Sequence, residues 1–176
     1  MRRVRLLAVL PLALVLLGAD AAARAPLPTV PRVDLERYMG EWYVIANIPT
    51  LWEREAFNAH ESYRLNPDGT IAATFTFRKG GFDGPLKVMK PKSWVQDPGS
   101  NAAWWMQFFW PLKAEYLIAY LSPDYSESIV ARTKRDYVWI MARTPSISES
   151  DYAGLVEKVT ELGYDATKLR RMPQHW

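Results

Sequence analysis

Residues 59–78 read AHESYRLNPDGTIAATFTFR, and this stretch predicts two antiparallel β-strands joined by a tight turn. The turn is Asn66–Gly69, which combines a proline that fixes its own φ angle with a glycine that tolerates positive φ. After the turn, aromatic side chains alternate with threonines, so that Phe75 and Phe77 share one face. Because successive side chains of a strand point to opposite faces, we expect the aromatic face to be buried.

Eight segments of this type follow one another, with polar turns between them. Strands joined by such short connections are antiparallel neighbours. The eight predicted strands are Trp42–Ile48, Ala59–Leu65, Thr70–Arg78, Leu86–Val95, Ala103–Phe109, Tyr116–Leu121, Ser128–Arg132 and Tyr137–Ala142.

A single clear helix is predicted after the last strand. Ser148 is a suitable N-cap, Asp151 lies three residues on, and Gly163 is a typical C-terminal stop. The apolar stripe between them, at spacings of three and four residues, consists of Tyr152, Leu155, Val156, Val159 and Leu162. We expect this stripe to pack on the outside of the sheet, and a groove for a partner helix is the alternative.

Eight successive antiparallel strands and one C-terminal helix predict an all-β fold, an eight-stranded antiparallel up-and-down barrel with the α-helix packed outside. A barrel is favoured over a sandwich because closing the sheet removes exposed strand edges. The interior of an eight-stranded barrel can hold one small ligand. The length of 176 residues suits one such domain.

The N-terminus has the features of a secretory signal peptide. Three arginines, Arg2, Arg3 and Arg5, precede the apolar run Leu6–Leu17, and Ala21–Ala23 supplies small residues for cleavage. An uncleaved anchor is the alternative. The predicted parts of the chain are a signal peptide at 1–23, an extended leader at 24–32, and the barrel with its C-terminal helix at 33–176.

The composition excludes several classes of site. Cysteine is absent, which rules out disulfides, thiolate metal sites, cysteine nucleophiles and a lipidated cysteine anchor, and two histidines argue against a multi-histidine metal site. We therefore expect no metal and no cofactor. The formal net charge of +3 falls to +1 without residues 1–23, so no nucleic-acid partner is expected. We expect an exported protein, periplasmic or secreted, with association to an outer membrane left open.

Two motifs carry a resemblance to a known family. Gly40–Tyr43 (GEWY) opens the first strand, and residues 137–145 (YVWIMARTP) end the last one. Together they resemble the lipocalin family, more closely the bacterial outer-membrane lipocalins and their animal relative apolipoprotein D, over about residues 33–170. The family's middle motif, usually Thr-Asp-Tyr, is degenerate here, and Ser122–Tyr125 (SPDY) is its nearest match. The resemblance implies a barrel that binds hydrophobic molecules.

Gly40, Trp42 and Arg143 are predicted to close one end of the barrel. If Trp42 faces inward, its indole plugs the narrow end. Arg143 would then lay its guanidinium group across that indole and donate to nearby backbone carbonyls. We expect these residues to serve structure rather than ligand contact.

Side chains alternate between the two faces of a strand, so inward-facing Trp42 and Arg143 predict which other residues face the ligand. The predicted lining is aromatic and aliphatic with a few polar groups, which suits an acyl chain or a flat hydrophobic molecule. Trp139, midway along the last strand, is the best single candidate, and a solidly packed interior is the alternative. The predicted ligand-binding residues are Trp139, Tyr137, Met141, Val44, Ala46, Glu61, Tyr63, Phe75 and Phe77.

Glu61 is the one carboxylate expected to face inward. An isolated buried charge is costly, so it would pair with a cation such as Lys90 or Lys92, bind a polar group of the ligand, or take up a proton. A position at a rim open to water is the alternative.

The mouth of the barrel is predicted to carry exposed aromatic side chains beside basic ones. The loops at that end supply Trp52, Phe82, Trp110 and Leu112, beside Lys79, Lys113, Lys134 and Arg135. Such a collar could dock on a membrane, or its rings could fold inward as a lid.

The sequence favours a non-catalytic carrier of lipids, of the fatty-acid or lysophospholipid type, with a role in envelope maintenance. An enzyme acting on a hydrophobic substrate is the second hypothesis, although His60 is predicted on the outer face and His175 lies near the C-terminus, so neither suits a catalytic triad. An envelope scaffold is the third. The predicted partners are a lipid or similar small molecule and a membrane surface contacted peripherally, and the oligomeric state is left open.

Overall fold

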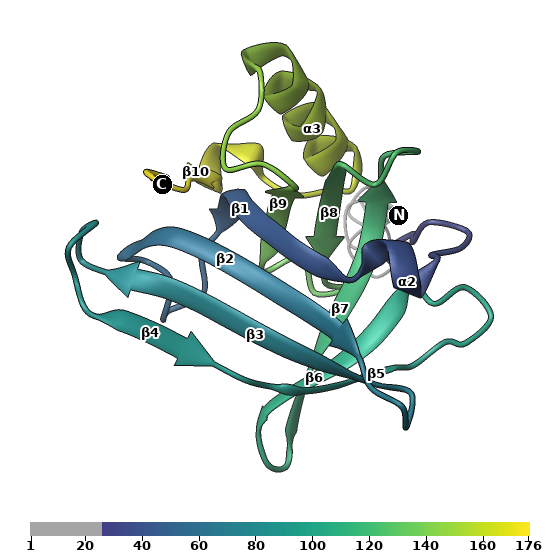
Figure 1. Ribbon diagram of the computed structural model, residues 1–176. Helices are drawn as coiled ribbons and strands as arrows, with labels where there is room; N and C mark the ends of the chain where they lie inside the picture. Colours follow the sequence, from purple (N-terminus) through teal and green to yellow (C-terminus); the bar gives the residue numbers. More distant parts are fainter. Residues whose placement is uncertain (1–25) are drawn as a thin grey trace, which may run out of the picture.

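The computed structural model describes residues 26–176, and the predicted signal peptide lies outside the described residues. The chain forms a closed antiparallel barrel with one long helix beside it (Figure 1). Its elements are α2 (Leu35–Tyr38), β1 (Gly40–Ile48), β2 (Ala56–Leu65), β3 (Thr70–Lys79), β4 (Leu86–Met89), β5 (Lys92–Val95), β6 (Ala103–Phe109), β7 (Leu112–Leu121), β8 (Glu127–Ala131), β9 (Val138–Ala142), α3 (Glu149–Glu161), the 3₁₀ turn Ala166–Lys168 and β10 (Arg170–Arg171).

The barrel closes because β1 pairs with both β2 and β9. Each strand is antiparallel to its neighbours, and the predicted strand 86–95 is divided into β4 and β5, both of which pair with β3. Counted together, β4 and β5 take the place of one of the eight strands of the barrel. The predicted fold, an eight-stranded antiparallel barrel with the helix outside, is confirmed.

The β2–β3 hairpin forms as its sequence predicts. Leu65 lies opposite Ile71, and Gly69 in the turn has a φ of 79°. Along β3, buried and partly buried residues alternate, with Phe75 and Phe77 buried. The aromatic face of the strand therefore points to the interior.

A bulge in β1 changes which side chains face inward. Val44 lies opposite Met141, but Ala46 lies opposite Ile140, so the register shifts at the residue between them. Ala46 consequently packs in the outer cluster with Leu155 of α3. The expectation that Ala46 faces the interior differs from the structure, because strict alternation fails at a bulge.

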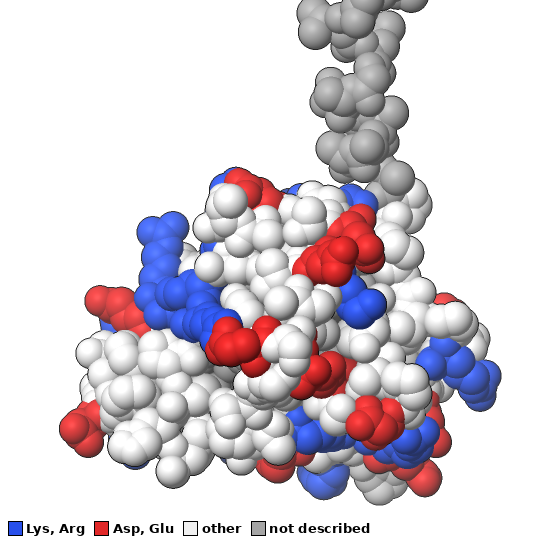
Figure 2. Space-filling model, turned by 90° about the horizontal axis from the view of Figure 1, so that it is seen from above, with Lys and Arg blue, Asp and Glu red and all other residues white. Residues whose placement is uncertain are grey.

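Helix α3 packs on the outside of the barrel. Ser148 accepts a hydrogen bond from the backbone N–H of Asp151, which caps the helix N-terminus. Leu155 and Val159 are buried against outer residues of the sheet such as Ile140. On the face that carries α3, a run of basic side chains lies beside groups of acidic ones (Figure 2).

The C-terminal segment completes the barrel wall where β1 and β2 separate. Beyond their paired residues, β10 pairs with Ala46 of β1, and Met172 donates its backbone N–H to the carbonyl of Ile45. Gln174 bridges both strands, since its side-chain amide donates to the carbonyls of Val44 and Ala59. The last residues of the chain thus hold β1 and β2 together beside the interior.

Candidate functional site

One end of the barrel is closed by Trp42 and Arg143. The guanidinium carbon of Arg143 lies 3.8 Å from the centre of the indole ring. Arg143 also donates to the backbone carbonyls of Glu41 at 2.8 Å and Tyr38 at 3.1 Å. Gly40 has a φ of 94°, a backbone conformation that L side chains rarely adopt, and a Cβ there would be in van der Waals contact with Nη1 of Arg143 at 3.4 Å. These contacts tie β1, α2 and the end of β9 into one stopper.

Above this stopper, an aromatic floor fills the barrel. Trp104 and Tyr116 stack with ring centres 4.8 Å apart, and the hydroxyl groups of Tyr38 and Tyr116 are 2.9 Å apart. Tyr63 packs edge-on against Trp104 and Tyr116. This floor seals the closed end, and Tyr63 belongs to it rather than to the open space above.

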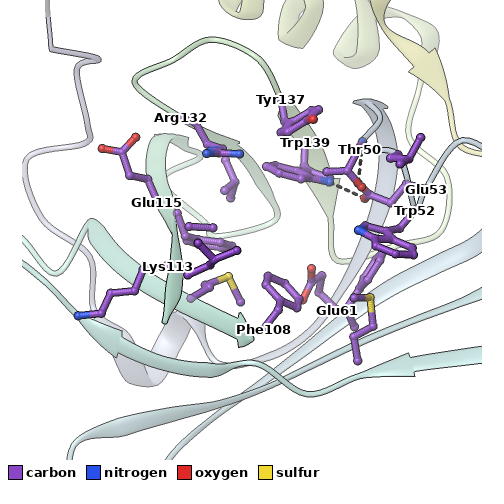
Figure 3. A pocket seen from close by; sticks show the side chains of 18 of the residues that line it. Thr50, Trp52, Glu53, Glu61, Phe108, Lys113, Glu115, Arg132, Tyr137 and Trp139 are labelled. Carbon is purple, nitrogen blue, oxygen red and sulfur yellow. Dashed lines mark hydrogen bonds between the residues drawn. The ribbon is translucent and has the colours of Figure 1, made fainter. Parts of the chain in front are cut away.

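Above the floor, the barrel contains a cavity of about 310 Å³ that opens at the opposite end (Figure 3). Its volume falls at the lower end of the range for small-molecule sites. The walls are mostly apolar, with a few charged groups. The lining residues are Thr50, Leu51, Trp52, Glu53, Glu61, Phe75, Met89, Met106, Phe108, Phe109, Leu112, Lys113, Ala114, Glu115, Tyr116, Val130, Arg132, Tyr137, Trp139 and Met141.

Five of the nine predicted ligand-binding residues line this cavity, namely Trp139, Tyr137, Met141, Glu61 and Phe75. The other four do not. Val44 and Phe77 pack in the wall against Met172, Tyr63 lies in the floor, and Ala46 lies outside. Ligand contact by any of them remains a prediction.

Trp139 fixes the loop between β1 and β2 at the mouth. Its indole N–H donates to Oε1 of Glu53 at 2.7 Å, and Oε2 of Glu53 accepts from the backbone N–H of Thr50 at 3.0 Å (Figure 3). Asn47 of β1 donates to the same carboxylate at 3.2 Å. Sequence reasoning missed Glu53, because nothing in the sequence shows that an acidic loop residue turns inward.

Glu61 points into the cavity (Figure 3), and it makes no ion pair with any residue in the range 26–176. Burial raises the pKa of its carboxyl group to about 8, and the neighbouring carboxylate of Glu53 acts in the same direction. Lys90 and Lys92, the expected partners, lie along an outer groove with Arg64. Of the alternatives open from the sequence, uptake of a proton fits this environment best.

The mouth carries exposed apolar side chains. Leu51 and Trp52 of the β1–β2 loop and Leu112 of the β6–β7 hairpin both line the cavity and face outward. Trp110, at the tip of that hairpin, is 87% exposed and does not line the cavity. Phe82 also lies away from the lining, because it packs against Phe57 and His175.

Basic side chains accompany these apolar ones. Lys113 and Arg132 line the cavity, and Arg132 lies 3.5 Å from Asp136 and over the ring of Tyr137. Lys79 pairs with Glu55 at 3.6 Å. Of the basic residues predicted at the mouth, Lys113 lines the cavity, and Arg132, which was not among them, lines it as well.

The two histidines of the chain do not line the cavity. Nε2 of His60 contacts Glu41 on the outside of the barrel, and His175 lies in the C-terminal segment. Within residues 26–176, no group of three or more histidine, aspartate or glutamate side chains is arranged to hold a metal ion. No helix in that same range is long and apolar enough to cross a membrane.

Similar proteins place this cavity in a known context. The chain is 34% identical over 160 residues to temperature-induced lipocalin-1 of Arabidopsis thaliana, covering 84% of this chain and 83% of that protein. It is 28% identical to outer membrane lipoprotein Blc of Escherichia coli K12, covering 90% and 93% of the two chains. Apolipoprotein D of Mus musculus is 25% identical, with 86% and 82% covered.

A solved structure and a family model are also similar to this chain. Insecticyanin of Manduca sexta superposes with a TM-score of 0.65 at 14% identity, covering 84% of each chain. A family model described as a lipocalin-like domain matches residues 33–174. With its stoppered barrel, open cavity and outer helix, the chain belongs to the lipocalin family, whose members bind small hydrophobic ligands.

Proposed function

We propose that this lipocalin binds and carries single-chain lipids of the fatty-acid or lysophospholipid type, without catalysing a reaction on them. The observation that carries the proposal is the apolar cavity of about 310 Å³ that opens at a mouth with cationic side chains. Each methylene group moved from water into such a space contributes roughly 0.8 kcal/mol, so about ten of them suffice without any polar contact. An acyl chain therefore matches the lining.

The position of the charged residues supports an orientation with the head group at the mouth. Lys113 and Arg132 line the cavity and Arg132 is partly exposed, whereas Oε2 of Glu61 is buried. An anionic head group is attracted by these two cationic groups. A small cavity also favours this orientation, since the head group then stays outside it.

The proposed place of action is the cell envelope or the space outside the cell, where such lipids are released from membranes. The signal-like residues 1–23 support export, and one relative is named as an outer membrane lipoprotein. The exposed side chains of Leu51, Trp52 and Trp110 at the mouth would enter a membrane interface, as amphipathic surfaces do. Peripheral contact would let a lipid pass from the membrane into the cavity.

Native mass spectrometry of protein purified from its host tests the proposal. We expect a bound species whose mass matches a fatty acid or lysophospholipid and which disappears after extraction with organic solvent. Delipidated protein should then bind dodecanoate or lysophosphatidylcholine with one-to-one stoichiometry. Protein that is empty on isolation and binds neither probe would overturn the proposal, and turnover of the bound lipid would replace the carrier by an enzyme.

A further inference from the structure

Among the buried polar atoms that have no partner in the described part of the protein, two belong to neighbouring inward-facing residues of β2. Oε2 of Glu61 and Oη of Tyr63 both lack a hydrogen bond. The two residues are two positions apart on β2, so both side chains point to the interior. Folded proteins pair nearly all such groups, so an unpaired one in the wall of a cavity favours a bound molecule that can hydrogen-bond to it.

The carboxyl group of Glu61 is mainly uncharged at neutral pH. Burial raises its pKa to about 8, and the nearby hydroxyl group of Tyr63 favours the charged form by a smaller amount without forming a hydrogen bond to Oε2. A protonated carboxyl group offers one O–H donor and one carbonyl acceptor. The unpaired Oε2 therefore needs an acceptor if it carries the proton and a donor if it does not, and a group that can do both suits either arrangement.

Among simple chemical groups, an uncharged hydroxyl meets this requirement best. A carboxylate beside Glu61 would bring a negative charge into a largely apolar space, and the cationic residues that line the cavity, Lys113 and Arg132, make no ion pair with Glu61 in the described part of the protein. An ammonium group would have to lose its hydration and require an ionised Glu61 in an apolar space. A methyl end would leave the carboxyl group of Glu61 unpaired.

We propose that the cavity selects single-chain lipids that carry a hydroxyl group on the end of the chain that reaches Glu61, while the head group stays at the mouth. This inference rests on the proposed function and specifies its ligand class. Glu61, which lines the cavity, contributes the hydrogen bond to the hydroxyl group. The selection depends on a donor and an acceptor deep in the apolar wall, where a site built to bind a hydroxyl discriminates against its absence.

A cycle of two ligands and two proteins tests this selection. The ligands are dodecanoate and ω-hydroxydodecanoate, which share a head group and differ only in the terminal hydroxyl. The proteins are the delipidated wild type and Glu61→Leu. Dissociation constants are measured by isothermal titration calorimetry at pH 7.

We expect the wild type to bind ω-hydroxydodecanoate at least as tightly as dodecanoate. In Glu61→Leu the hydroxylated ligand should lose at least about tenfold in affinity relative to dodecanoate, because its hydroxyl group is then buried without a partner. Glu61→Gln keeps a donor and an acceptor at the same place and should retain most of the preference. Glu157→Leu, a change on the exposed face of α3, is the matched control and should leave both dissociation constants unchanged.

The outcomes separate this inference from the function on which it rests. If both ligands bind and the ratio of their dissociation constants is the same in the wild type and Glu61→Leu, the selection is wrong and the lipid carrier stands. An ordered water on Glu61 would give that result. If folded wild-type protein binds neither ligand, both the selection and the proposed function are wrong. Circular dichroism and the melting temperature establish that each variant is folded.

The infrared band of the protonated carboxyl group gives a second readout. In wild-type protein this band should shift to lower frequency on binding ω-hydroxydodecanoate and shift less with dodecanoate, because a hydrogen bond weakens the C=O bond. Glu61→Gln should lack the band. A band that is unaffected by the hydroxylated ligand would contradict the proposed contact.

Discussion

Replacing Glu61 by glutamine is expected to stabilise the empty protein by an amount that grows with pH. Burial raises the pKa of Glu61 from an ordinary value of 4.5 to about 8. A carboxyl group whose pKa rises on folding contributes stability that is fully present below its unfolded pKa, near 4.5, and is lost as the pH increases through about 8. Glutamine has nearly the same shape and does not titrate, so the variant is free of this loss.

The size of the pKa shift of Glu61 sets the size of this change in stability. At about 1.4 kcal/mol per pKa unit, the rise from 4.5 to about 8 corresponds to roughly 4–5 kcal/mol between the two pH limits. Water that enters through the mouth of the cavity screens the charge and reduces this amount. A gain of about 2 kcal/mol or more between pH 5 and pH 9 is therefore expected for Glu61→Gln over the wild type.

Urea unfolding followed by circular dichroism measures this gain at a series of pH values. The free energy of unfolding of Glu61→Gln should separate progressively from that of the wild type up to about pH 8 and then run parallel to it. Glu157→Gln, on the exposed face of α3, should follow the wild type throughout. A difference between Glu61→Gln and wild type that is the same at pH 5 and pH 9 would refute a buried, protonated Glu61.

Three further outcomes follow from the geometry. Trp42→Ala should lower the free energy of unfolding by about 3–5 kcal/mol, and Arg143→Ala should also lower it, because each removes one partner of the contact that closes the barrel. Thermal unfolding tests this, and unchanged stability with lost ligand binding would contradict the structural role. Trp139→Phe removes a hydrogen-bond donor from the buried carboxylate of Glu53, so it should lower the free energy of unfolding by about 1–3 kcal/mol. It should also increase hydrogen exchange in residues 49–55. Unchanged exchange there would show that the loop is held by other contacts. Trp52→Ser combined with Trp110→Ser should reduce sedimentation with anionic phospholipid vesicles. The control is Trp105→Ser, on the opposite face of β6 from the buried Met106, and it should sediment like the wild type. Equal sedimentation of the wild type, the double variant and the control would contradict the membrane contact.

The fold was predictable because its signals are local. The turn at Asn66–Gly69 and the alternation along β3 define a hairpin without any long-range information, and both appear in the structure. The cap at Ser148 and the stripe containing Leu155 likewise define α3. Eight such local patterns in sequence leave few ways to close a sheet.

The site was less predictable because its features depend on register and on contacts between distant segments. A single extra residue in β1 moves Ala46 to the outer face, and no residue type marks that bulge. Phe108 and Phe109 line the mouth, but β6 is apolar on both faces, so alternation could not assign them. Glu53 acquires its place from Trp139, which is far along the chain.

The division of the fourth predicted strand has a local cause that the sequence did contain. Lys90 and Pro91 separate β4 from β5, and a proline cannot donate a hydrogen bond to a neighbouring strand. β4 consequently pairs with β3 alone, while β5 continues the barrel toward β6. Proline inside an apparent strand was the available signal.

Methionine methyl NMR tests most directly whether the barrel takes an apolar guest into its interior. Met89, Met106 and Met141 line the cavity, while Met39 and Met172 do not, so the chain contains its own controls. On titration of delipidated, methyl-labelled protein with dodecanoate, the first three methyl signals should shift together and saturate at one equivalent, and the other two should move little. A titration that leaves the three cavity methionines unshifted would contradict a hollow, ligand-accepting barrel.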